Sequence, residues 1–149
     1  MKRPDWPGWK NVLPALAGSD HSTHNLSLAM ALGAFIAPTP IVGVHTWMAL
    51  GLAFLFRVNR LAAFVGSNVS NPLSLIPLTI LDIKVGLWMV GKEYPDWLAA
   101  DQSAKELFEL LGEVYLEAWL GSIPVGIIVG IIVYGISFFT INRWRKNRS

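Results

Sequence analysis

The chain has 149 residues, of which 53% are apolar and only 15% are charged, with a net charge of +2. Soluble domains carry about a quarter charged residues, so this composition argues against an ordinary water-facing surface and indicates a membrane protein. The small net charge does not suggest nucleic-acid binding. The absence of cysteine excludes disulfides, thiolate metal sites and a cysteine nucleophile.

The first segment, residues 1–25, is predicted to be cytoplasmic and interfacial, because tryptophan rings near its start favour the lipid headgroup level. Asp20, His21 and His24 form the pattern D-H-x-x-H. Two histidines one turn apart can hold a metal ion. Ser19 or Asp20 as a helix N-cap explains the same residues, and we expect no metal here.

The membrane domain, residues 26–91, is predicted to contain two helical segments that are broken by proline. Apolar residues 26–37 and 41–56 flank Pro38 and Pro40, which remove backbone donors and disfavour helix. At about 1.5 Å per residue, neither half comfortably spans a hydrocarbon core of about 30 Å. The pattern therefore predicts a re-entrant helical hairpin with a broken tip.

A second break, at Asn71 and Pro72, divides the next apolar run. We expect this run to cross the membrane once, as a broken helix. A glycine stands shortly before each break, Gly33 before Pro38 and Gly66 before Pro72. Paired broken segments point to an internal repeat of the kind found in transporters, and a coincidence of spacing is the alternative.

Residues 92–118 are predicted to form an acidic extracytoplasmic loop. Ser103 and Glu106 make a capping box, which predicts an amphipathic helix with leucines on one face and glutamates on another. This helix is either a lid on the outer end of the bundle or a solvated connector.

Residues 119–142 are predicted to form a transmembrane helix, because about 20 apolar residues suffice to span a bilayer and residues 119–141 carry no charge. Gly126 and Gly130 form a GxxxG pair, which indicates close packing against a helix of the same chain or self-association. A basic tail, residues 143–149, closes the chain.

Basic residues indicate the topology, since lysine and arginine mark the cytoplasmic side. They cluster in residues 2–10, at Arg57 and Arg60, and in residues 143–149. With all three groups in the cytoplasm, the hairpin must leave and return to the same side. Both termini are then cytoplasmic in a multi-pass membrane protein. Arg57 and Arg60 either contact phosphate headgroups or fix this topology.

Ionisable and amide groups near the breaks are the candidates for function. His45 lies five residues after Pro40, and an ionisable group inside a membrane is either functional or hydrogen-bonded to a freed carbonyl. Asn71 either satisfies carbonyls at its break or contacts a polar substrate. Asp82 could pair with an arginine of the hairpin. The candidate substrate-binding residues are Pro38, Pro40, Gly43, His45, Thr46, Asn71 and Pro72.

Three motifs resemble a bacterial membrane-protein family known only as a domain of unknown function: P-T-P-I-V-G-V-H-T at 38–46, R-V-N-R at 57–60 and S-N-P at 70–72. The family's pattern is P-x-P-x-x-G-x-Q-T, so His45 stands where glutamine is usual, which counts against a dedicated proton-transfer role there. The resemblance covers about residues 26–91 and implies an integral inner-membrane protein. The hairpin is also distantly similar to the architecture proposed for DedA-like lipid-transport proteins.

The expected fold is therefore an all-α integral membrane protein with a re-entrant hairpin, a broken crossing helix and a C-terminal transmembrane helix. The first functional hypothesis is a transporter or lipid-flippase-like module that contacts membrane lipids and forms a homo-oligomer or binds a membrane partner. A non-catalytic scaffold or accessory subunit is the alternative. No constellation of catalytic residues stands out, so we expect neither an enzyme nor a cofactor.

Overall fold

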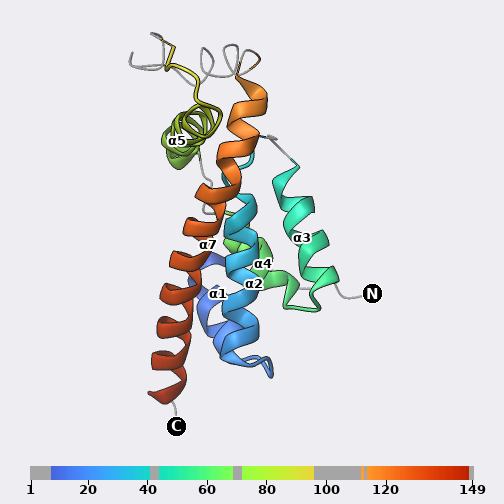
Figure 1. The fold of residues 1–149 in the computed structure, drawn as a ribbon. Helices are drawn as coiled ribbons and strands as arrows, with labels where there is room; N and C mark the ends of the chain where they lie inside the picture. Colours follow the sequence, from blue (N-terminus) through green and yellow to red (C-terminus); the bar gives the residue numbers. More distant parts are fainter. Residues whose placement is uncertain (1–7, 41–43, 69–71, 96–111, 113, 148–149) are drawn as a thin grey trace.

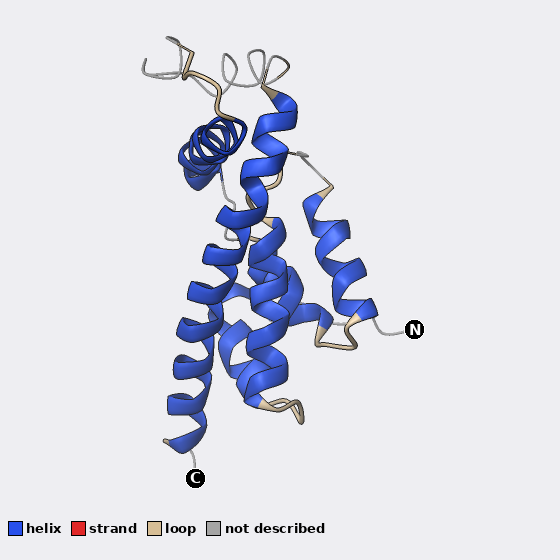
Figure 2. Ribbon diagram, in the orientation of Figure 1, coloured by secondary structure: helices blue, strands red, loops and turns tan. Residues whose placement is uncertain are grey.

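A computed structural model describes residues 8–40, 44–68, 72–95, 112 and 114–147. Throughout this described part the regular structure is helical, without a strand (Figure 2). The expectation of an all-α chain is confirmed. The helices are α1 (Gly8–Ala17), α2 (Thr23–Ile36), α3 (His45–Leu55), α4 (Arg60–Ser67), α5 (Pro72–Val90) and α7 (Tyr115–Lys146).

The long helix α7 packs antiparallel on α2 through the two glycines of the GxxxG pair (Figure 1). A Cβ atom at Gly126 would lie 2.4 Å from the carbonyl oxygen of Phe35, and one at Gly130 would lie 3.2 Å from that of Ala31. At Gly126 only a residue without a side chain permits such an approach, and at Gly130 a side chain would be a tight fit. Of the two interpretations of this motif, packing within the same chain is therefore the one that the structure shows.

Helices α2 and α4 begin at the same end of the molecule and cross at the two glycines that precede the breaks. The backbone N–H of Asn59 donates to Oδ1 of Asn25 over 3.1 Å, which joins the two helix starts. A Cβ atom at Gly33 would lie 2.1 Å from the carbonyl oxygen of Ala63, and one at Gly66 would lie 2.0 Å from that of Met30. Gly33 and Gly66 thus lie at a single close crossing of α2 and α4.

Helix α3 returns alongside α2, which gives the predicted helical hairpin (Figure 1). It ends in a Schellman motif, in which Arg57 adopts a left-handed φ of 53°. The N–H of Val58 donates to Ala53 over 3.0 Å, and Val58 packs against the core. The outer face of the helix is apolar and exposed, with Trp47 74% and Phe54 70% exposed.

Helix α5 lies at a steep angle to the long helix α7 (Figure 1). Figure 1 shows α5 almost end-on, whereas α7 runs along the length of the molecule, so the two axes cross steeply. A Cβ atom at Gly86 would meet the carbonyl oxygen of Glu117 at 1.7 Å, and one at Gly121 would meet that of Asp82 at 1.8 Å. This second pair of glycines allows α5 to lie across α7.

Two local details were not predicted from the sequence. Residues 8–17 form a helix, and its Val12 and Leu16 join the same core cluster as Ile141 near the end of α7. The N-cap of α2 is Ser22, whose side chain accepts from the N–H of Asn25 over 3.1 Å, rather than Ser19 or Asp20. Ser22 has the extended backbone that a cap requires.

Helix α7 has 32 residues and therefore extends beyond the predicted span at both ends. It is the one helix of the described part that is long and apolar enough to cross a membrane, and only 22% of its most apolar window is buried. The expected capping box at 103–106 and the N-terminal tryptophan pair lie outside the described residues or side chains.

Candidate functional site

The α2 side of the first helix break is buried. Ala37, Pro38 and Thr39 are buried. The hydroxyl of Thr39 donates to the carbonyl oxygen of Ile36 over 2.7 Å, and its backbone N–H donates to the same oxygen over 3.0 Å. The carbonyl end of α2 is therefore partly satisfied by the turn itself.

The far side of this break is the start of α3. His45 is the first residue of the helix, and both His45 and Thr46 are half-buried. Val44 occupies the N-cap position, where its side chain cannot accept a hydrogen bond, so the first N–H groups of α3 have no side-chain cap. Pro40 is half-buried, and Gly43 lies outside the described residues.

The second break begins at the end of α4. The hydroxyl of Ser67 and the amide Nδ2 of Asn68 both donate to the carbonyl oxygen of Phe64, over 2.8 Å and 2.7 Å. An amide at the break thus satisfies a helix carbonyl, the structural role that the sequence allows. Asn71 lies outside the described residues, and Pro72 is the first residue of α5.

The crossing of α2 and α4 brings the two breaks close together. A Cβ atom at Gly33 would lie 2.6 Å from the backbone nitrogen of Ser67. Ser67 ends α4, and Gly33 lies one turn before the end of α2 at Ile36. The described candidates Pro38, Pro40, His45 and Thr46 lie at the end of the hairpin where α2 ends and α3 begins.

The two arginines of the hairpin turn lie away from this tip. Arg57 and Arg60 are exposed and line, with Phe54 and its neighbours, a surface hollow of about 480 Å³. The guanidinium of Arg60 lies 5.5 Å from the ring centre of Phe54. Two cations beside an apolar wall suit both a phosphate headgroup contact and a role in topology.

A polar cluster at the base of α2 and α7 is not apparent from the sequence. Arg145 donates from Nε to the carbonyl oxygen of Ala17 over 2.9 Å, and from Nη2 to those of Ser19 and His21 over 3.1 and 2.6 Å. It also donates to the hydroxyl of Thr23 over 3.2 Å. The sequence of the basic tail does not distinguish Arg145 from its neighbours, because the groups that accept its hydrogen bonds lie more than 120 residues away in the chain.

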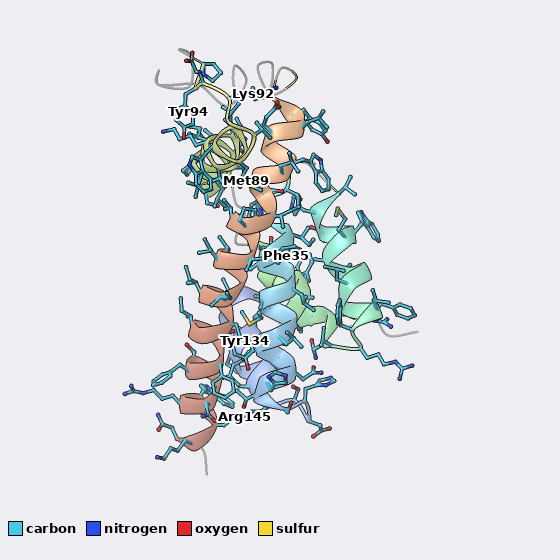
Figure 3. All side chains as sticks on the ribbon, in the orientation of Figure 1. Phe35, Met89, Lys92, Tyr94, Tyr134 and Arg145 are labelled. Atoms are coloured by element: carbon cyan, nitrogen blue, oxygen red, sulfur yellow. The ribbon has the colours of Figure 1, made fainter. Side chains whose placement is uncertain are left out.

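The histidines of the D-H-x-x-H pattern contact residues of α7 near this cluster. Nδ1 of His24 lies 2.8 Å from the hydroxyl of Tyr134, and the backbone carbonyl of His21 accepts from Arg145. Figure 3 labels Tyr134 and Arg145 on α7. Within the part of the chain that the structure describes, no group of three His, Cys, Asp or Glu side chains could hold a metal ion.

Asp82 does not form the expected pair with a hairpin arginine within the described residues. Its side chain is fully buried where α5 crosses α7, and neither carboxyl oxygen has a described hydrogen-bond partner. The ion pair that the structure does show joins Nζ of Lys92 to Oε1 of Glu117 at 2.5 Å, beside the same crossing.

Comparison with known proteins places these features in a family. Residues 9–149 match the family described as "Uncharacterized protein conserved in bacteria (DUF2062)". No curated protein and no solved structure matches the chain. The family match covers both breaks, the α5–α7 crossing and the basic end of α7.

Proposed function

The chain belongs to this bacterial family of unknown function, DUF2062, and from the geometry of its helix breaks we propose that it is a transporter or lipid-flippase-like module of the cytoplasmic membrane. The observation that carries the proposal is the close approach of Gly33 to the backbone nitrogen of Ser67. Gly33 precedes Pro38, and Ser67 precedes Pro72, by five residues each. Broken helices inside a membrane are tolerated where the backbone lines a cavity or is buried in protein. Adjacent breaks are the usual place for a transported group.

The exposed apolar surface supports membrane insertion. The central part of α7 exposes Ile127, Ile128, Ile131 and Ile132, each by about half or more. A core helix of a soluble protein would bury such residues. Figure 1 also places the Arg57–Arg60 turn toward the end of the molecule that holds the C-terminus, whereas Lys92 in Figure 3 lies at the opposite end. This arrangement supports the proposed topology, with the termini and the hairpin turn in the cytoplasm.

The proposed site is the start of α3, with His45 and Thr46 as the polar side chains that the structure describes. N–H groups at an uncapped helix start attract anions, so a phosphate-bearing headgroup fits this end. Gly43, Asn71 and Pro72 belong to the proposed site by their place in the two breaks. Arg57 and Arg60 would contact headgroups at the membrane surface.

A reconstituted system tests this proposal. The purified protein is inserted into vesicles that contain a fluorescent phospholipid, and a membrane-impermeant quencher reports how fast the lipid changes leaflet. We expect the wild-type protein to accelerate this exchange and His45→Leu to slow it at least tenfold. His45→Gln should be mild, because glutamine keeps a hydrogen bond.

Gly51→Ala is the matched control on the same helix, since a Cβ atom there meets nothing within 4 Å. It should leave exchange unchanged and should not lower stability. The proposal fails if wild-type protein moves neither the lipid nor small ions above the rate of empty vesicles. The site assignment fails if His45→Leu lowers activity only in proportion to a lower unfolding temperature.

The second candidate is a membrane scaffold or accessory subunit, in which the breaks shape a docking surface. The observation that favours it is the burial of Ala37, Pro38 and Thr39. In this case wild-type vesicles show no exchange, and chemical crosslinking in native membranes traps a homo-oligomer or a membrane partner.

A further inference from the structure

A carboxyl group is enclosed where α5 crosses α7. Asp82 has 0% of its surface exposed, and neither of its carboxyl oxygens accepts a hydrogen bond from any described residue. The two backbones approach closely here, with Gly121 against the carbonyl oxygen of Asp82 and Gly86 against that of Glu117. Apolar side chains of Ile83, Leu87, Val114 and Ala118 form the neighbouring core.

The charged groups around the crossing do not compensate Asp82. On α7, Glu117 is engaged by Lys92 over 2.5 Å, and Tyr115 is exposed. On α5 itself, Lys84 is exposed, and two residues along a helix place side chains on different faces. The remaining basic groups of α7, Arg143, Arg145 and Lys146, lie at its far end.

An unpaired carboxylate is very costly in such surroundings, whereas the neutral acid costs far less. The ligand that this buried carboxyl group can bind is therefore a proton. We propose that Asp82 is a proton-binding site, whose carboxyl group is neutral while α5 is packed on α7 and releases its proton to bulk water when this crossing opens.

This site also deepens the proposed function. If the chain transports, opening of the α5–α7 crossing is coupled to loss of the proton, and the proton is the coupling ion; that consequence rests on the proposed function. The protonation itself does not, because it depends only on the packing of the two helices.

Equilibrium unfolding in mixed detergent micelles measures the protonation. Where the native state holds a proton that the unfolded state has lost, stability falls as pH rises. One such proton changes the unfolding equilibrium constant tenfold per pH unit. We expect wild-type stability to fall in this way between about pH 5 and pH 7, a range above the ordinary carboxyl titration. Asp82→Asn should lack that fall and be at least as stable as wild type at the upper end.

Lys84→Gln is the matched control, because it removes an exposed charge from the same helix. It should keep the wild-type pH dependence. The proposal is overturned if Asp82→Asn keeps that dependence, or if it is strongly destabilised at every pH, which would reveal a cationic partner for Asp82.

Infrared spectroscopy of the folded wild-type protein tests the proposal even if the variant Asp82→Asn does not fold. A neutral carboxyl group has a C=O stretch well separated from that of a carboxylate. With aspartate labelled by ¹³C, we expect a labelled neutral-acid band at pH 7, and its absence overturns the proposal. Neither measurement involves transport, so failed lipid exchange with a positive protonation result refutes only the proposed function. If only the protonation measurements fail, the lipid-exchange result still stands as the test of the proposed function.

Discussion

Replacement of Gly66 by alanine adds one methyl group at the crossing of α2 and α4. The new Cβ atom would lie 2.0 Å from the carbonyl oxygen of Met30 and 2.7 Å from its carbonyl carbon. Carbon and oxygen atoms come no closer than about 3.3 Å in ordinary contacts. The two helices would have to separate by about 1 Å, since both obstacles are backbone atoms that cannot change rotamer.

The expected loss follows from this geometry. Overpacking a core typically costs about 1–3 kcal/mol, and the absence of a movable side chain puts Gly66→Ala at about 3 kcal/mol, the upper end of that range. Gly33→Ala should be similar, because its Cβ atom would lie 2.1 Å from the carbonyl oxygen of Ala63. Gly130→Ala, with its nearest atom at 3.2 Å, should cost less than about 1 kcal/mol.

Unfolding by SDS in mixed micelles, followed by tryptophan fluorescence, gives these differences. Gly51→Ala and Gly135→Ala are the controls, because a Cβ atom meets nothing within 4 Å at either position. They should be neutral or stabilising by up to about 1 kcal/mol, since alanine favours helix over glycine. If Gly66→Ala unfolds at the same SDS fraction as Gly51→Ala, the close crossing of α2 and α4 is wrong.

Arg57→Gly should stabilise the protein by about 1 kcal/mol, because glycine adopts the left-handed φ of 53° without steric cost; an unchanged or lower unfolding midpoint would contradict the strained end of α3. Arg145→Lys should destabilise it by about 2 kcal/mol, since one ammonium group cannot reproduce a guanidinium that donates to the carbonyls of Ala17, Ser19 and His21. Lys146→Gln changes the next residue, which is exposed, and should alter the unfolding midpoint little. Equal midpoints for both variants would argue against the hydrogen bonds of Arg145.

The positions of the helix breaks were determined by the sequence alone. Proline acts on its own backbone and on the residue before it, so α2 ends at Ile36, before Pro38, and α5 begins at Pro72. The all-helical class follows in the same way from long apolar runs. The GxxxG pair likewise predicted a close helix contact, because the lack of side chains at Gly126 and Gly130 is a local property.

Only the tertiary structure decided which helices meet. It gave α2 as the partner of α7, turned α5 across α7, joined Arg145 to the loop before α2 and enclosed Asp82 without a described partner. It also formed α1, whose buried residues Val12, Leu16 and Ala17 belong to the same core cluster as Ile141. These outcomes depend on contacts between residues far apart in the chain, whose geometry is set by the packing of whole helices, and no local pattern of side chains specifies that geometry.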